Sequence, residues 1–203
     1  MRTALLTLAV LLAGAPPADA AVTLSSGHAD IGARIVGGKL QTQVKDATSG
    51  KVVWRDPSDV VVALSAKARY TLPDRENVRF LGKPGTRLWL IPQTQRAGVV
   101  WLGWNTEDLT SRQLRGNVGW TLERVNGPGR VVLFQTGSFG KADVLFDSSR
   151  SRPGTRTIPA GVHAHGNWAF ARAGTYRLRF RMSGTSRSGR ALADTATLTV
   201  RAS

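Results

Sequence analysis

Short runs of strand-forming residues, separated by turn residues, constrain the fold of this chain more than any other feature of its sequence. Gly37-Gly38 separates two such runs, 29–36 and 40–44, and Asn126-Gly127-Pro128-Gly129 separates another two. Turns of this composition join neighbouring antiparallel strands, so each predicts a β-hairpin. The only candidate helix, around 106–115, is short and lacks a clear apolar face. We therefore predict an all-β fold.

The C-terminal part of the chain favours a particular kind of sandwich. Tyr176 follows Ala173-Gly174-Thr175 and begins a strand in which apolar residues alternate with arginines, and a last strand follows at 196–200. A tyrosine at the start of a penultimate strand is typical of the tyrosine corner of immunoglobulin-like sandwiches, where its hydroxyl holds the preceding loop. We predict a single immunoglobulin-like β-sandwich over 21–203, ending in a tyrosine-corner-like strand pair.

The first 20 residues have the pattern of a secretory signal peptide. Arg2 precedes an apolar run at 3–14, and Ala18-Asp19-Ala20 matches the small-residue pattern at a cleavage site. The apolar run is too short for a permanent membrane anchor, and no later apolar segment of about 20 residues follows. We expect a secreted or cell-wall-associated protein, with no transmembrane anchor in the mature chain.

The charge and the absence of cysteine limit the classes of partner and ligand. The net charge is +15 at pH 7 and the chain contains no cysteine, so neither disulfides nor thiolate ligands are available. Export and the single, dispersed placement of the arginines argue against nucleic acid as a partner. The charge either directs the protein to an anionic cell wall or membrane surface or simply keeps it soluble.

The three histidines of the chain form the most specific pattern. His163 and His165 are two residues apart, so on a strand their side chains share one face at a spacing of about 6.6 Å. His28 is far away in sequence, but all three histidines lie beside glycines, which allow close approach of a ligand or neighbouring backbone. We predict that the fold brings His28 to the other two to form a metal site.

Asp30 is the candidate for a fourth ligand, because it shares a strand face with His28. It either binds the metal directly or orients an imidazole, and the alternative is an ordinary charge on an edge strand. Three imidazoles and one oxygen suit Zn²⁺ best, while Mn²⁺, Fe²⁺ and Cu²⁺ also accept such ligands. The metal site of the hypothesis therefore contains His28, Asp30, His163 and His165.

Other residues give weaker indications. Trp89, Trp101 and Trp104 are interpreted as core residues, with an aromatic platform for glycans as the alternative. Trp168 either lines the histidine site or fills the core, and the polar segment 135–140 suits a loop at the mouth of a ligand site. No Gly-x-Ser-x-Gly motif or cysteine is present, nothing local points to a Ser-His-Asp triad, and paired carboxylates for glycoside hydrolysis are hard to place, so we do not expect an enzyme.

Four segments together resemble a known family. Residues 27–32, 101–107, 133–140 and 158–168 are similar to successive landmarks of the actinobacterial surface-anchored repeat domain often called the choice-of-anchor M domain. The His-x-His-Gly-x-Trp part is the most recognisable. The resemblance implies association with ABC transporters of the metal-uptake type, and hence an extracytoplasmic role in metal capture or delivery. Unlike the family, the chain has one copy of the domain and no sorting signal or C-terminal membrane tail, which favours a secreted or wall-associated form.

Two alternatives stand beside this hypothesis. In the first, the protein is a structural or adhesive surface module whose histidines only hydrogen-bond loops together. In the second, it carries a copper site of the kind that uses the N-terminal amine with a histidine as first residue. Cleavage after Ala20 would leave His28 several residues inside the mature chain, which argues against the copper site.

Overall fold

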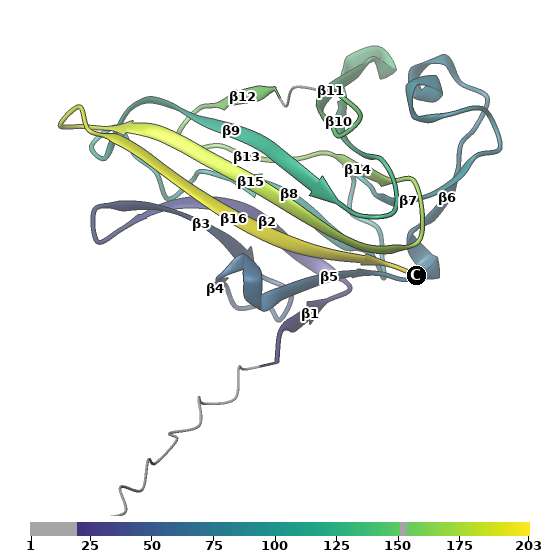
Figure 1. Cartoon of the computed structure of the whole chain (residues 1–203), viewed down its shortest axis with the longest axis horizontal. Coiled ribbons are helices and arrows are strands. Elements are labelled where there is room, and N and C mark those ends of the chain that lie inside the picture. The colour runs from purple at the N-terminus through teal and green to yellow at the C-terminus, as the bar shows by residue number, and fades with distance from the viewer. Residues whose placement is uncertain (1–19, 151–153) are drawn as a thin grey trace, which may run out of the picture.

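A computed structural model describes residues 20–150 and 154–203. Its strands form three sheets, and its helical segments are short 3₁₀ turns (Figure 1). The predicted all-β, sandwich-like class is therefore confirmed. The predicted signal peptide lies outside the described residues, apart from Ala20. Within the described part of the chain, no helix has the length and apolarity needed to cross a membrane.

The elements have the following bounds. The first sheet has the strand order β1 (Val22–Leu24), β5 (Val60–Leu64), β16 (Ala191–Ala202), β15 (Gly174–Ser186), β9 (Leu114–Asn126) and β12 (Thr155–Ile158). The second has the order β11 (Ala142–Asp147), β10 (Val131–Thr136), β14 (Asn167–Phe170), β7 (Arg87–Ile91) and β6 (Arg69–Thr71). The third has the order β13 (His163–His165), β8 (Val100–Asn105), β2 (Gly27–Val36), β3 (Lys39–Asp46) and β4 (Val53–Arg55). The 3₁₀ turns are η1 (Pro57–Asp59), η2 (Ala66–Ala68), η3 (Glu76–Leu81) and η4 (Ser138–Gly140).

The main core is formed by the inner faces of all three sheets, with the first sheet packed against the other two. Alternate residues of β15, such as Leu178 and Phe180, point into it, and Ile31 of β2 points into it from the third sheet. Trp104 of β8 meets Trp120 of β9 with ring centroids 5.5 Å apart, which joins the two sheets directly. The outer faces of the first and third sheets are thus left mainly for polar side chains, as the alternation in the sequence predicts.

The first predicted hairpin is confirmed and the second is wrong. Gly37 and Gly38 have φ of 56° and 73°, and they connect the paired strands β2 and β3. By contrast, β9 pairs with β12 and β15, whereas β10 pairs with β11 and β14. The segment 127–130 therefore crosses from one sheet to another. Its glycines allow close packing, because a Cβ atom at Gly127 would lie 2.4 Å from Cδ1 of Tyr176.

The candidate helix at 106–115 is also wrong, since that segment consists of turns that lead into β9 at Leu114. Thr106, the first residue of the segment, is fully buried, and its backbone N–H donates to the carbonyl of Val162 at 2.8 Å. Its carbonyl in turn accepts from the N–H of Gly161 at 2.9 Å. These long-range bonds tie the start of the segment to the turn that precedes β13.

Tyr176 holds the loop before β15. Its hydroxyl donates to the carbonyl of Arg172 at 2.7 Å and accepts from the N–H of the same residue at 3.1 Å. The ring is fully buried and packs edge-on against Phe170, with centroids 5.1 Å apart. The hydroxyl and the ring of Tyr176 together fix this loop to the start of β15.

Replacing Tyr176 by Phe should remove both hydrogen bonds and leave two backbone groups of Arg172 without a partner. We expect a loss of about 1–2 kcal/mol in the free energy of unfolding, measured by urea titration. Tyr70→Phe is the matched control, because Tyr70 is half-exposed, and it should change stability by less than about 0.5 kcal/mol. Equal effects of the two substitutions would show that the hydroxyl of Tyr176 contributes nothing specific.

Candidate metal centre

Three neighbouring strands of the third sheet position the predicted ligands. β8 lies in the middle, β2 runs parallel to it on one side, and β13 runs antiparallel on the other. Asp30 of β2 and His165 of β13 both lie opposite Gly103 of β8. Because successive strand residues point to opposite faces, the neighbours Ala29 and Ile31 fill the core while Asp30 points away from it.

Gly103 provides the space in which these side chains meet. A Cβ atom there would lie 2.5 Å from Oδ1 of Asp30, 2.6 Å from the carbonyl oxygen of Ala164 and 2.8 Å from Cε1 of His165. Any larger residue in the central strand would push the flanking side chains apart. Gly103 was not among the predicted site residues. A glycine inside a buried strand nevertheless indicates close approach of another group, and this feature could have identified it.

The four predicted ligands lie together, with the atoms that bind metal facing one another. Nε2 of His163 is 3.1 Å from Nε2 of His28 and 3.0 Å from Nε2 of His165. Oδ1 of Asp30 is 3.2 Å from Nε2 of both His28 and His163, and 3.7 Å from Nε2 of His165. His28 therefore does converge on the His163/His165 pair, as the predicted metal site requires.

These separations match the edges of a tetrahedron around a small ion. The edges of a regular tetrahedron are about 1.6 times the distance from centre to corner, so zinc–ligand distances of about 2.0–2.1 Å correspond to edges of about 3.3–3.4 Å. Five of the six separations among the ligand atoms run from 3.0 to 3.7 Å, and all of them lie within 4.8 Å. An ion could thus be placed among the four atoms with little movement of the side chains.

Burial determines the protonation of the site. Asp30 is fully buried, which raises the pKa of its carboxyl, while His28, His163 and a hydrogen bond from Asn105 act in the opposite direction. Burial, together with the neighbouring His163 and His28, lowers the pKa of His165 to about 4. His165 is therefore neutral at pH 7, the state in which an imidazole binds metal.

A hydrogen-bond network orients Asp30. Asn105 is buried, and its Nδ2 donates to Oδ2 of Asp30 at 3.3 Å and to Oε2 of Glu107 at 2.7 Å. Lys45 donates to the same oxygen of Glu107 at 3.0 Å. The network occupies one carboxylate oxygen of Asp30 and leaves the other to face the histidines, as carboxylates beside a metal are usually held.

Trp101 forms one wall of the site. Its ring stacks on that of His165 with centroids 3.7 Å apart and planes 11° apart, and its Nε1 donates to the carbonyl of Gln93 at 2.8 Å. Nδ1 of His165 is buried without a hydrogen-bond partner in the described part of the chain, so stacking orients this ring. Trp101 was expected in the core. Trp168 does lie in the core, where its Nε1 donates to the carbonyl of Leu102.

Two polar residues fix β13 next to β8. Oγ1 of Thr106 donates to the carbonyl of Pro159 at 2.7 Å and accepts from the N–H of Val162 at 3.0 Å, which holds the turn before β13. Gln135, from the segment predicted to form a ligand mouth, donates to the carbonyl of His165 at 2.8 Å. Both contacts join residues that are distant in sequence. Neither Thr106 nor Gln135 was predicted to hold β13 in place.

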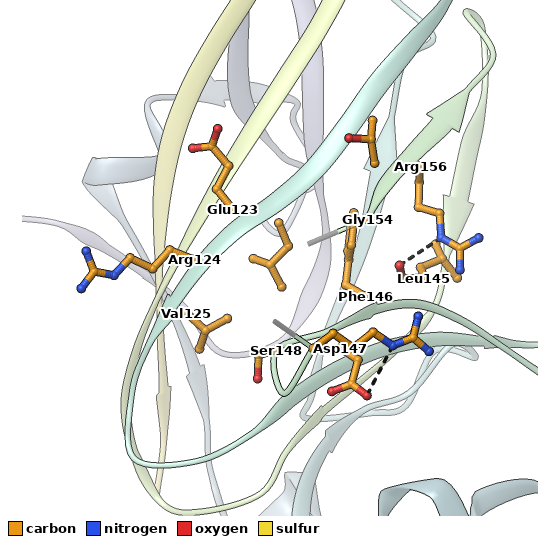
Figure 2. Close-up of a pocket in the computed structure, with 12 residues that line it drawn as sticks. Glu123, Arg124, Val125, Leu145, Phe146, Asp147, Ser148, Gly154 and Arg156 are labelled. Atoms are coloured by element: carbon orange, nitrogen blue, oxygen red, sulfur yellow. Dashed lines mark hydrogen bonds and ion pairs between the residues drawn. The ribbon is translucent and has the colours of Figure 1, made fainter. Parts of the chain in front are cut away.

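A separate cavity of about 500 Å³ lies between β9, β11 and β12 (Figure 2). Its main acidic group, Asp147, accepts hydrogen bonds from Arg130 at 2.8 and 2.7 Å, and these bonds hold the pKa of its carboxyl well below the usual range. Arg156 likewise donates to the carbonyls of Leu145 and Val144. Asp147 and Arg156 are thus already paired within the protein, and we assign no chemistry to this cavity.

No protein-family model, curated protein or solved structure matches the chain at a significant level. Function is therefore inferred below from the side chains themselves. The strongest chemical feature is the group formed by His28, Asp30, His163 and His165, whose ligand atoms all lie within 4.8 Å of one another.

Replacing Gly103 by Ala should disrupt the site without changing a ligand. The added methyl group would contact Asp30, Ala164 and His165, so we expect a loss of about 1–3 kcal/mol in the free energy of unfolding, measured by urea titration. Gly184→Ala is the matched control within a strand, since its nearest neighbour would be 3.6 Å away. If both variants unfold at the same urea concentration as the wild type, Gly103 is not required for close approach.

Proposed function

We propose that this chain is an exported accessory protein that captures or delivers a divalent metal ion, with Zn²⁺ as the preferred metal. The observation that carries the proposal is the convergence of three imidazole nitrogens and one carboxylate oxygen, with five of their six separations at 3.0–3.7 Å. Those residues would hold the ion, which would neutralise the carboxylate of Asp30. Zinc in proteins is commonly bound by four such ligands.

The ligand set favours binding over catalysis. Catalytic zinc sites usually keep one position open for water, whereas four protein ligands close the coordination shell. Ca²⁺ is disfavoured because it takes about six to eight oxygen ligands. Mn²⁺ and Fe²⁺ generally bind such sites more weakly than Zn²⁺, and Cu²⁺ more strongly, so metal supply contributes to selectivity.

The exposure of the ligands suits an ion that enters and leaves. The side chains of His28 and His163 are 25% and 29% exposed, whereas those of Asp30 and His165 are 0% and 8% exposed. Two ligands therefore lie at the surface and two lie beneath it. An ion held in this way can exchange without unfolding the sandwich, as capture and delivery both require.

The partner and location are part of the proposal. The resemblance to the choice-of-anchor M domain supports an ABC uptake system for metals as the partner. The signal-peptide pattern of residues 1–20 supports a secreted or cell-wall-associated location. The hydrogen bonds of Tyr176 support the immunoglobulin-like assignment of the sandwich.

The alternative function is a non-enzymatic structural or adhesive surface module. One observation favours it: the separations of 3.1 and 3.0 Å between the ring nitrogens are also hydrogen-bond distances. In that case the three histidines would tie β2 to β13 without an ion.

Mass spectrometry of the mature N-terminus tests the copper alternative, which requires His28 as the first residue.

Calorimetric titration of the metal-free protein with Zn²⁺, Mn²⁺ and Cu²⁺ tests the proposal. We expect one Zn²⁺ per chain for the wild type, accompanied by a change in tryptophan fluorescence because Trp101 stacks on His165. His163→Ala/His165→Ala should bind no Zn²⁺ at this site. Asp30→Asn should weaken binding at least about tenfold, whereas Asp59→Asn, at an exposed position, should leave it unchanged.

Thermal unfolding separates the two functions. A saturating ion should stabilise the folded protein by about 2.7 kcal/mol at 100 times its dissociation constant, so the melting temperature should rise with Zn²⁺ concentration. The double histidine variant should show no such rise. The structural module would be supported instead if the wild type and the double variant bound the same number of Zn²⁺ ions per chain, or if Zn²⁺ changed the melting temperature of neither.

A further inference from the structure

The outer face of the first sheet carries a row of arginines along its longest strands. β9, β15 and β16 run side by side across the molecule (Figure 1). In β15, Tyr176, Leu178, Phe180 and Met182 are buried, and the residues between them, Arg177, Arg179 and Arg181, are exposed. Side chains two positions apart on one strand are separated by about 6.8 Å, so the charges form a regular line.

Polar groups flank this line on both sides. On the β16 side, the register places Arg177, Arg179 and Arg181 opposite Thr199, Thr197 and Thr195. On the β9 side, it places them opposite Asn126, Arg124 and Thr121. Each guanidinium therefore has a threonine hydroxyl on the neighbouring strand, and none has an acidic residue directly opposite in either pairing.

The positive charge of the face is largely uncompensated. Glu123 accepts a hydrogen bond from Arg179 at 3.0 Å, whereas Arg177 and Arg181 form no ion pair within residues 20–150 and 154–203. Arg124 lies beside Arg179, and Figure 2 shows its side chain extending away from β9. Like charges placed opposite each other on a sheet are destabilising, so the arrangement is better explained by an anionic ligand than by stability.

The chemistry of the face selects among anionic partners. Arginine binds phosphate through two parallel hydrogen bonds, and an adjacent threonine hydroxyl can donate a third. The arginine row and its strand partners include no aromatic side chain, on which the bases of single-stranded nucleic acid would stack. They also include no large apolar side chain, as insertion into a membrane surface would require.

We propose that this arginine row, Arg177, Arg179 and Arg181, binds a linear polyol-phosphate polymer. The spacing of about 6.8 Å between neighbouring arginines is comparable to the length of an extended three-carbon polyol phosphate repeat, so successive phosphates meet successive guanidinium groups. The site lies on the opposite side of the main core from the histidine cluster, and it does not depend on metal binding.

Binding of a defined poly(glycerol phosphate) oligomer to the full chain, with a metal chelator present, tests the proposal. For three phosphate contacts, the logarithm of the association constant should fall with the logarithm of salt concentration with a slope of about −2. Arg177→Gln/Arg181→Gln should weaken binding at least about tenfold and reduce the slope by about two thirds. Arg177→Lys/Arg181→Lys should keep most of the salt dependence but lose affinity, because the bidentate geometry is lost.

Arg75→Gln/Arg87→Gln is the matched control, since it removes the same charge from exposed arginines outside the row. It should change the affinity less than about twofold. An equal loss in both double variants would mean that only the overall charge attracts the polymer. Tighter binding of single-stranded DNA or of phosphatidylglycerol vesicles than of the oligomer would likewise overturn the proposal.

Discussion

The missing side chain at Gly103 is the constraint on which the histidine cluster depends. Strands β2 and β13 each pair with β8 and not with each other, so their side chains can meet only across the middle strand. A glycine at that position lets Asp30 and His165 approach to distances that a Cβ atom would forbid. Gly103, which has no side chain, thus determines how closely the four clustered side chains can approach one another.

The buried carboxylate of Asp30 has the highest electrostatic cost in the cluster. Removing a charge from water is unfavourable unless hydrogen bonds and opposite charges replace the lost hydration. Asn105 satisfies one oxygen, and the histidines surround the other. A divalent cation would compensate this charge directly, and this supports the proposal that the cluster binds a metal ion.

The sequence predicted the strands and the pairing of His163 with His165 from local features: alternation along a strand, glycine turns and a two-residue spacing. The convergence of His28 was a hypothesis drawn from the glycines beside all three histidines. Apart from the β2–β3 hairpin and the final pair of β15 and β16, the sequence did not predict which strands become neighbours. The segment after Asn126 has the composition of a hairpin turn, yet it crosses between sheets because its glycines pack against Tyr176. Trp101 was predicted to lie in the core, but it lies on the outer face. Its position depends on the parallel pairing with His28, which no local sequence pattern encodes.

Strand β13 is only three residues long and forms the edge of its sheet. Edges present unpaired backbone groups to which other chains can add, and proteins protect them with short or covered strands. Here the strand that closes the edge of β8 also carries two of the four clustered side chains. Displacing β13 would therefore separate the four clustered side chains and expose the backbone groups of β8 at the same time, so the integrity of the cluster is linked to the protection of this edge.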